Sequence, residues 1–580
     1  MSRPLASPLI VARLTRSLCV VSFSLFCFAP PASAAFIEPE RSREAIVVSA
    51  HPLATEAGIE TLQSGGNAVD AAVATAFAIS VVEPFSAGIG GGGFLLTYQS
   101  DTDEMRSLDF RERAPKLASE DMYLDRQGEL IPRASLDGYL AAGVPGTVAG
   151  LYEVHQQYGE LPWREVVAPA IRLAREGFPV SRRFLRFAER RKDVLFNDPD
   201  ARAIFSRDGE MYELGDRLVQ RDLARTLTRI AADPKSFYTG EIAAAIAQDM
   251  AQRGGLVARD DLAAYQPIWR DPLCGDFRQF RLCAMPPPSS GGVHILQILN
   301  ILGDTDLKSL GWHHPDGLHL LIEAMRVAYA DRSKYLGDPD FVEIPVQALI
   351  SEDYARQRRN EISMQQARRS EDVRPADPQV LQRIEAESTN TSHLTVVDGD
   401  RNALSLTFTI NGGFGAGVVV RNTGIVLNNE MDDFAAAPGV PNLYGLVGGD
   451  ANAIAPGKTP LSSMTPTIVT QDGEFRLATG SPGGSTIITT VLQILIHVLV
   501  YEMDVGAAVS APRLHHQWQP DRVLIERWGF DAATLAELRR RGHELKIFDG
   551  WGNASAIALT EDGELEGAAD PRGEGAAIGL

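Results

Sequence analysis

The stretch that decides the fold is Asn390–Asp398, which has the sequence NTSHLTVVD. Polar His393 and Thr395 alternate in it with apolar Leu394 and Val396. Alternation with a period of two places side chains on opposite faces, so it predicts a strand whose two faces differ in polarity. His393 is expected to be a packed strand histidine rather than a catalytic base.

A second alternating run, residues 403–411, follows a turn signal at 398–402. It places apolar side chains on one face and hydroxyl or amide side chains on the other, namely Leu404, Leu406, Phe408 and Ile410 against Ser405, Thr407, Thr409 and Asn411. The two runs together predict a hairpin with one apolar and one polar face. By pattern alone, the simpler interpretation is an ordinary half-exposed hairpin without a chemical role.

Thr391 gains a chemical role if the chain is cut immediately before it. A threonine hydroxyl is a weak nucleophile near neutral pH and needs an adjacent base. A free α-amine, with a reference pKa of roughly 7.7–8.0, suits that task, whereas the nitrogen of an uncut chain is an amide and cannot act as a base. We therefore predict a precursor that is activated when the bond between Asn390 and Thr391 breaks.

The composition is that of a globular protein. Of the 580 residues, 44% are hydrophobic and 22% are charged, and the length allows a large core. The net charge of −20 argues against nucleic acid as a partner.

Residues 1–34 have the pattern of a secretory signal peptide. Arg3, Arg13 and Arg16 precede or enter the apolar stretch 18–29, and a small-residue cleavage site, Ala-Ser-Ala, occupies residues 32–34. No later run is long and apolar enough to span a bilayer, so no membrane anchor is expected.

Two of the four cysteines fall within the signal, which leaves Cys274 and Cys283. The eight residues between them can fold as a hairpin, and an oxidising compartment permits a disulfide, but the sequence leaves free thiols equally open. Two cysteines at this spacing lack the pattern of a zinc site. The adjacent histidine pairs at 313–314 and 515–516 also lack metal-site spacing, so no metal or cofactor is expected.

The glycine-rich stretch 87–93 resembles a phosphate-binding loop only superficially. Such a loop follows a strand and opens a helix. Here the glycines follow an Ala-rich helix predicted over 68–82, which Asn67 can cap, and they enter a strand. Close packing of the backbone is the better explanation.

The first half of the chain is organised as a strand, a helix and a long helical region. We predict a strand over 46–49, a helix over 54–63, and mostly helices over 143–340. Residues 355–390 are charged and then polar with almost no aromatic residue, which indicates an exposed linker that would tolerate a cut at its end.

These features resemble the gamma-glutamyltranspeptidases, which are members of the N-terminal nucleophile hydrolase superfamily. The resemblance extends over essentially the whole chain after the signal and rests on ordered segments: 65–71 (GGNAVDA), 109–112 (DFRE), 286–292 (PPPSSGG), 391–393 (TSH), 427–434 (LNNEMDDF), 460–464 (PLSSM) and 480–484 (GSPGG). It implies an α/β fold, a four-layer αββα sandwich. It also implies self-cleavage into a large subunit, residues 35–390, and a small subunit, 391–580, that remain together as a heterodimer.

The resemblance assigns the reacting groups. Thr391 would be the nucleophile and its α-amine the base, and Thr409 would hydrogen-bond the nucleophile's oxygen. Gly483 and Gly484 match the pair whose backbone N–H groups form the oxyanion hole. Without side chains they let those groups approach closely, and a helix starting just after them would help to hold negative charge.

The resemblance also assigns the groups that hold the γ-glutamyl head. Arg111 matches the arginine that grips its α-carboxylate through two parallel bonds, and Ser462 and Ser463 would add donors. Glu430 and Asp433 match the positions that bind its α-ammonium, and some relatives carry Gln in place of the glutamate.

Two further residues complete the expected site. Asn411 matches another contact to the glutamyl head. Tyr444 lies in a Pro/Gly-rich loop, residues 438–449, that matches a lid over the site, and relatives without the lid favour other acyl substrates.

The activity implied is acyl transfer, as a gamma-glutamyltransferase and glutathione hydrolase. The γ-glutamyl group of glutathione or a related compound would pass to Thr391, then to water or to an acceptor amino acid or peptide. The signal implies the periplasm. Two alternatives remain: an acylase of the same superfamily acting on another acyl group, such as a glutaryl-cephalosporin, and an uncut secreted binding protein.

Overall fold

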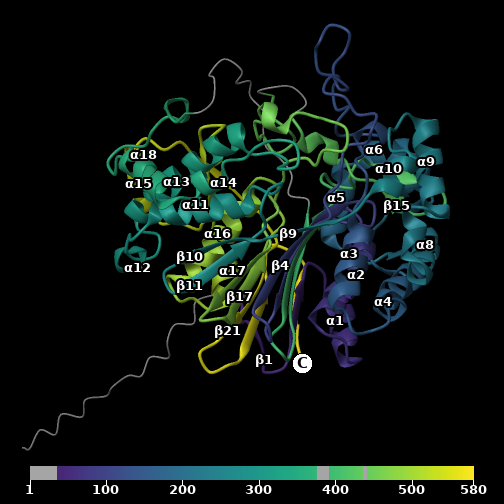
Figure 1. The fold of residues 1–580 in the computed structure, drawn as a ribbon, viewed down its shortest axis with the longest axis horizontal. Helices are drawn as coiled ribbons and strands as arrows, with labels where there is room; N and C mark the ends of the chain where they lie inside the picture. Colours follow the sequence, from purple (N-terminus) through teal and green to yellow (C-terminus); the bar gives the residue numbers. More distant parts are fainter. Residues whose placement is uncertain (1–35, 375–390, 436–439) are drawn as a thin grey trace, which may run out of the picture. The chain divides into compact units, whose positions relative to one another are not determined.

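Two seven-stranded sheets face each other in the computed structural model, with helices on both outer sides (Figure 1). The structure describes residues 36–374, 391–435 and 440–580, and Ile37–Leu580 form one unit. The predicted signal peptide lies outside the described residues.

Both sheets are antiparallel throughout. The first sheet has the order β23 (Ala576–Gly579), β2 (Ile46–Ser49), β12 (Ser392–Val397), β13 (Ala403–Thr409), β3 (Gly92–Gln99), β4 (Glu104–Asp109) and β9 (Ile268–Arg270). The second has the order β1 (Glu40–Ser42), β22 (Leu565–Ala569), β21 (Ser555–Leu559), β17 (Glu474–Gly480), β16 (Thr467–Gln471), β11 (Phe280–Ala284) and β10 (Leu273–Phe277).

The predicted hairpin is present as β12 and β13, in the middle of the first sheet. The half-exposed interpretation is wrong, because every residue of both strands is buried. The apolar face, with Leu394 and Leu406, packs in a core shared with the helices outside the first sheet. The polar face is covered by the second sheet, where the Ser405 hydroxyl donates to the carbonyl of Thr479 at 3.1 Å.

The helices form the two outer layers, and Figure 1 shows one set on each side of the paired sheets. Outside the first sheet lie α1 (Pro52–Gln63), α2 (Ala68–Val82), α3 (Thr147–Tyr158), α4 (Trp163–Glu176), α5 (Arg182–Arg190), α8 (Arg221–Ala232) and α9 (Glu241–Arg253). Outside the second lie α11 (Gly291–Leu302), α13 (Pro315–Tyr335), α15 (Glu352–Asn360) and α16 (Thr486–Leu499). The expected four-layer αββα sandwich is confirmed.

Helix α2 has the bounds that its sequence predicts, and its first turn explains why. The Asn67 side chain accepts from the backbone N–H groups of Val69 and Asp70, while the Asp70 carboxylate accepts from the Asn67 N–H. This reciprocal cap satisfies donors that a helix start otherwise leaves without partners. Every residue of α2 is buried, as its Ala-rich composition predicts.

The glycine-rich stretch packs backbone against backbone, as predicted. A Cβ on Gly91 would collide with the carbonyl oxygen of Thr409, and one on Gly90 would collide with that of Val426. The absence of side chains therefore lets the entry to β3 lie directly beside the end of β13, where the candidate site is built.

A disulfide joins Cys274 and Cys283, which face each other across the β10–β11 hairpin. The sequence left a disulfide and free thiols equally open, and the structure has the disulfide.

Residues 355–374 are largely exposed, as expected, but they are not a structureless linker. Helix α15 occupies part of this stretch, and Ser370 and Val373 are buried. One charge of the stretch also pairs with a buried residue, in the 2.7 Å contact between Arg368 and Glu323, so a helix and a few buried contacts hold a stretch that is otherwise largely exposed. Residues 375–390 lie outside the described residues.

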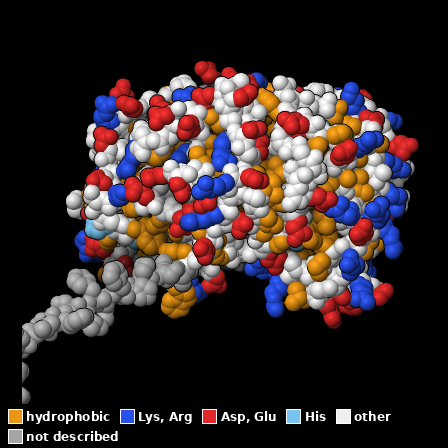
Figure 2. Space-filling view, turned by 90° about the horizontal axis from the view of Figure 1, so that it is seen from below, with side chains coloured by type: hydrophobic (Ala, Val, Ile, Leu, Met, Phe, Trp, Pro, Cys, Tyr) orange, Lys and Arg blue, Asp and Glu red, His pale blue; other side chains and the backbone are white. Residues whose placement is uncertain are grey.

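The surface carries charges of both signs. On the face drawn in Figure 2, acidic and basic side chains are interspersed among apolar ones. Among the helices that the structure describes, none combines the length and the apolar character needed to cross a membrane.

Candidate active site

Thr391 lies at the start of β12, beside the end of β13. The pairing of Ser392 with Phe408 places Thr391 opposite Thr409. The Thr391 hydroxyl lies 3.4 Å from the Thr409 hydroxyl, which also accepts the backbone N–H of Asn411 at 2.8 Å. Thr391 is 3% exposed, so the candidate nucleophile is held inside the sandwich rather than on its surface.

A small cavity opens at this point. Its lining includes every predicted site residue except Gly483: Arg111, Thr391, Thr409, Asn411, Glu430, Asp433, Tyr444, Ser462, Ser463 and Gly484, together with Leu446, Met464 and Ile487. Segments far apart in the sequence thus meet in one place.

Arg111 is the positive centre of the cavity and is buried between two acids. Its guanidinium donates from Nη1 to Glu430 Oε1 at 2.5 Å and from Nη2 to Asp433 Oδ2 at 2.6 Å. Its Nε donates to the carbonyl of Pro460 at 3.2 Å, which fixes the plane of the group. Burial alone would lower the pKa of Arg111, but the two carboxylates outweigh it and raise that pKa above its usual value.

Glu112, the next residue, adds a third buried acid. Burial raises the pKa of Glu112 to about 7 and raises that of Glu430 well above its usual value. No described group donates a hydrogen bond to Glu112 or to Glu430 Oε2 when both acids are ionised. Like charges so close cannot both ionise easily, so the two acids favour a proton or a bound cation beside them.

Arg332, on α13, is a second buried cation beside the cavity. It donates from Nε to the Ser290 hydroxyl at 3.1 Å and from Nη2 to the Ser463 hydroxyl at 3.4 Å. It makes no ion pair with any residue that the structure describes. Burial, with Arg111 as a further cause, lowers the pKa of Arg332 to about 10. A buried charge without a partner is costly, so this guanidinium favours an anion near Ser463.

The loop that carries Ser462 and Ser463 is held by the 286–292 segment. The backbone N–H and the hydroxyl of Ser290 both donate to the carbonyl of Ser462 at 2.8 Å. The Ser462 hydroxyl accepts the N–H of Met464 at 3.0 Å. The segment therefore positions the two serines and does not line the cavity itself.

Gly483 and Gly484 form the turn that opens α16. Their φ angles are +143° and +54°, which side chains rarely adopt. A Cβ on Gly484 would also collide with the ring of Tyr444. The pair thus suits a backbone oxyanion hole, and Gly483 lines a neighbouring, larger cavity.

Tyr444 covers the site from the loop expected to be a lid. Its hydroxyl donates to the Asn411 side-chain oxygen at 2.5 Å and lies 3.2 Å from the Asn411 carbonyl. Burial, followed by the charges of Asp433 and Glu430, raises the pKa of Tyr444 well above its usual value. The phenol is therefore a neutral donor that ties the lid to Asn411. Residues 438 and 439 of the expected lid lie outside the described residues.

His393 does not line the cavity. It hydrogen-bonds the hydroxyls of Thr407 at 2.8 Å and Thr395 at 3.0 Å between the two sheets, and burial lowers its pKa to about 3. It has the packed position expected from the sequence. Among the described residues, no group of three or more His, Cys, Asp or Glu side chains is placed to hold a metal ion.

The sequence interpretation missed Glu112 and Arg332 as members of the site. Glu112 follows Arg111 directly, so its position in the DFRE segment was a usable signal. Arg332 gives no comparable signal, because it lies within a long helix more than two hundred residues from Arg111.

Comparisons with known proteins place the chain in one family. The sequence model of the family described as Gamma-glutamyltranspeptidase matches residues 54–580. The chain is 47% identical to a glutathione hydrolase proenzyme of Escherichia coli (strain K12), with 94% of each chain covered. It is 37% identical to an Acylase ACY 1 proenzyme of Pseudomonas sp. (strain SE83), with 94% of this chain and 95% of that one covered.

A solved structure with the same fold is the cephalosporin acylase from Bacillus halodurans. It superposes with a TM-score of 0.82 at 29% identity and covers 97% of this chain and 99% of its own. A match over nearly the whole chain, together with close sequence relatives, means that this protein belongs to the gamma-glutamyltranspeptidase family.

Proposed function

We propose that this protein is a self-cleaving gamma-glutamyltransferase and glutathione hydrolase. The observation that carries the proposal is the arrangement of Arg111 between Glu430 and Asp433 in the cavity that Thr391 lines. A cation flanked by acids is complementary to an α-amino acid head, which carries a carboxylate and an ammonium on one carbon.

Self-cleavage precedes activity. The Thr391 hydroxyl attacks the carbonyl carbon of Asn390, the peptide C–N bond breaks, and an ester forms while the nitrogen becomes an amine. Water then hydrolyses the ester. The products are a large subunit, residues 35–390, and a small subunit, 391–580. They remain a heterodimer because β12 and β13 pair with β2 and β3 of the large subunit.

Binding of the γ-glutamyl head exchanges ionic partners. The substrate α-carboxylate forms an ion pair with Arg111 and accepts further hydrogen bonds from Ser462 and Ser463. The α-ammonium forms ion pairs with Glu430 and Asp433. Arg332, which donates to Ser463, adds positive charge on the carboxylate side. Asn411, which Tyr444 holds, completes the contact to the head.

Acyl transfer then uses Thr391 twice. Its oxygen attacks the γ-carbonyl carbon, the α-amine accepts the hydroxyl proton, and the N–H groups of Gly483 and Gly484 hold the oxyanion. The α-amine returns the proton to the leaving amine as the C–N bond breaks, which leaves a γ-glutamyl ester on Thr391. Thr409 orients the nucleophile's oxygen. Water or an acceptor amine then attacks the ester through the same oxyanion hole.

An acylase that prefers glutaryl groups is the alternative, and the acidic side of the cavity argues against it. A glutaryl group lacks the α-ammonium. Its carboxylate would pair with Arg111 and leave the buried Glu430 and the partly buried Asp433 without a cation, which is unfavourable. The signal pattern supports export to the periplasm, with removal of residues 1–34.

Parallel assays on γ-glutamyl and glutaryl derivatives of one aniline test the proposal. We expect the purified protein to consist of two chains, the smaller beginning Thr-Ser-His-Leu, and to hydrolyse only the γ-glutamyl compound and glutathione. Activity restricted to the glutaryl compound would reject the proposal, and an uncut, inactive chain would favour a binding protein.

A further inference from the structure

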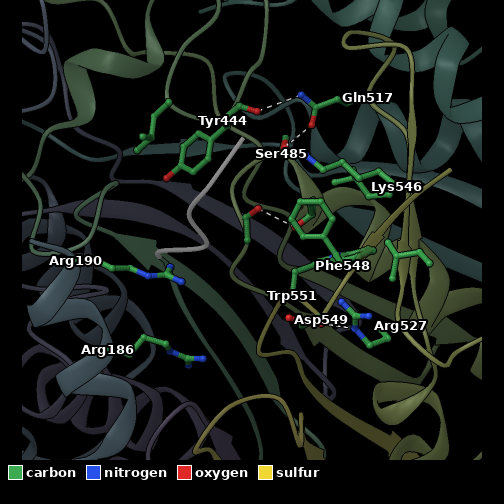
Figure 3. Close-up of a pocket in the computed structure, with 16 residues that line it drawn as sticks. Arg186, Arg190, Tyr444, Ser485, Gln517, Arg527, Lys546, Phe548, Asp549 and Trp551 are labelled. Atoms are coloured by element: carbon green, nitrogen blue, oxygen red, sulfur yellow. Dashed lines mark hydrogen bonds and ion pairs between the residues drawn. The ribbon is translucent and has the colours of Figure 1, made fainter. Parts of the chain in front are cut away.

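The turn that opens α16 lines two cavities, and Figure 3 shows the lining of the larger one. Gly484 lines the smaller cavity, Gly483 the larger one, and Tyr444 both. Neither glycine has a side chain that could hold the turn in place. The N–H groups of an oxyanion hole stabilise charge best when they are fixed before the reaction. Neighbouring residues must therefore hold this turn, and the next residue, Ser485, makes such contacts.

Ser485 is held from two sides. The hydroxyl of Tyr329, on α13, donates to the Ser485 carbonyl. The Ser485 hydroxyl donates to Gln517 Oε1 at 2.8 Å (Figure 3). Tyr329 and Gln517 lie far apart in the sequence, so tertiary packing rather than the turn's own sequence sets its position.

The Gln517 amide also holds the lid. Its Nε2 donates to the carbonyls of Tyr444 and Gly445 at 3.1 and 3.2 Å (Figure 3). Its Oε1 accepts from His515 Nε2 at 2.9 Å in addition to the Ser485 hydroxyl. An amide has two N–H donors and an oxygen with two lone pairs, so these four bonds use its whole capacity. Gln517 is therefore held in one place and one orientation.

His515 supports that orientation. It is buried, and burial lowers its pKa to about 4, so the imidazole is neutral near pH 7. Its Nδ1 lies 2.8 Å from the hydroxyl of Thr489, on α16. With Nδ1 accepting from this hydroxyl, Nε2 carries the hydrogen and donates to Gln517 Oε1. A flipped amide would turn its oxygen toward the two lid carbonyls, which excludes it.

The lid and the turn also touch directly. The Tyr444 ring packs against Gly484 so closely that a Cβ on the glycine would lie 2.2 Å from a ring carbon. The lid and the oxyanion turn are thus joined at two points, through this ring and through the Gln517 amide. A shift of the lid backbone would act on the turn through both.

We propose that Gln517 is a positioning residue that fastens the lid to the oxyanion turn, so that the cover of the site and the N–H groups of Gly483 and Gly484 form one rigid unit. This inference rests on the proposed function. Gln517 acts through Ser485 and the lid backbone, and it exchanges no proton and forms no bond with the substrate. Without it, the oxyanion donors lose their fixed direction, while Arg111 and Asp433 still hold the glutamyl head. The loss should therefore fall on kcat rather than on KM.

Single variants measure this split. Gln517→Met keeps an unbranched side chain of similar size but removes all four bonds. We expect its kcat on a γ-glutamyl-4-nitroanilide donor to fall about tenfold, with KM within about twofold of the wild type. Ser485→Ala removes one bond and leaves those to the lid, so kcat should fall about fivefold.

The control is Gln220→Met. Gln220 is also buried and donates to a backbone carbonyl, that of Val81 at 2.7 Å, but it lines neither cavity. Its kcat should match that of the wild type. Cleavage of each variant into two chains reports that it folds.

A double variant tests whether the two residues act through one link. Gln517→Met combined with Ser485→Ala should be no slower than Gln517→Met alone, because the serine hydroxyl acts through Gln517. A loss of about fiftyfold, the product of the two single effects, would mean that they act independently and would overturn the proposal.

The remaining outcomes also decide. An unchanged kcat in Gln517→Met, or a loss through KM alone, would overturn this inference while hydrolysis by the wild type still supports the proposed function. Should Gln517→Met stay uncut, Ser485→Ala decides, and an unchanged kcat in it would reject the link. A wild type inactive on every γ-glutamyl donor would overturn the proposed function and this inference with it.

Discussion

The two cavities that meet at Gly483 and Gly484 handle charge in opposite ways. In the smaller cavity, which we call the closed cavity because its lining is almost entirely buried, Arg111 is paired with two acids. In the larger cavity, which we call the open cavity because exposed side chains line part of it, Arg186 and Arg190 make no ion pair with a described residue.

This difference indicates how each side would select its ligand. A ligand of the closed cavity must replace ion pairs that are already made, so it needs both an anion and a cation in the right places. A ligand of the open cavity needs only a negative charge, and solvent and salt weaken its attraction. We therefore expect strict selection of a ligand by the closed cavity and looser, salt-sensitive binding in the open cavity.

The largest effect is expected at Thr391, the candidate nucleophile that lines the smaller cavity. Thr391→Ala removes the hydroxyl needed both for cleavage and for acyl transfer, so we expect a single uncut chain with no measurable activity, whatever the substrate. Gel electrophoresis and a γ-glutamyl anilide assay measure both. Thr391→Ser restores a hydroxyl and should restore cleavage. An active or cleaved Thr391→Ala protein would contradict the mechanism.

Arg111→Lys tests the closed cavity. A lysine cannot bond two oxygens in parallel, so kcat/KM for the γ-glutamyl donor should fall about hundredfold, or about 2.7 kcal/mol, mainly through KM. Arg253 also bridges two acids, Asp198 at 2.7 Å and Asp200 at 2.5 Å, away from the cavity. Arg253→Lys is therefore the control and should leave KM unchanged. Equal effects in both variants would mean that Arg111 is only structural.

The buried acids predict a pH dependence of donor binding. The pKa of Glu112 is raised to about 7, so its carboxyl is neutral below that pH and becomes an anion above it. The added negative charge favours the substrate ammonium, and KM should fall severalfold between about pH 6 and about pH 8. Glu112→Gln should flatten this dependence, whereas the titration of the Thr391 amine should persist in kcat. An unchanged KM profile in Glu112→Gln would refute the assignment.

The smallest effect is expected at the boundary between the cavities. Tyr444→Phe removes the hydrogen bonds to Asn411 but keeps the ring against Gly484, so the lid should loosen slightly. One neutral hydrogen bond is worth about 1 kcal/mol, and we expect hydrolysis to rise about two- to fourfold relative to transfer. The ratio of glutamate to γ-glutamyl peptide measures it. Tyr212→Phe, whose hydroxyl bonds Ile204, is the control.

Local sequence patterns predicted the elements around the site well. Helix α2 and the β12–β13 hairpin follow directly from composition and alternation, since neighbouring residues alone set those patterns. The individual residues of the closed cavity were identified by the resemblance to a known family. They include Arg111, which no local pattern identifies. All but Gly483 line that cavity together, while their proposed roles remain to be tested.

The prediction was weaker where distant segments decide burial. The polar face of β12–β13 has the pattern of an exposed surface, but the second sheet covers it. Residues 355–374 have the composition of a linker and are largely exposed, but Arg368 pairs with the buried Glu323, and Ser370 and Val373 are buried. In both cases the partner lies far away in the sequence, so local composition cannot report it.

The sequence by itself determined the β12–β13 hairpin, helix α2, the candidate nucleophile and the family, because each depends on residues close together or on ordered segments. Only the tertiary structure decided which charges share a cavity. It brought Arg332 to Ser463 and set Arg186 and Arg190 opposite Lys546, because packing of the layers, rather than order along the chain, sets the distances between charges.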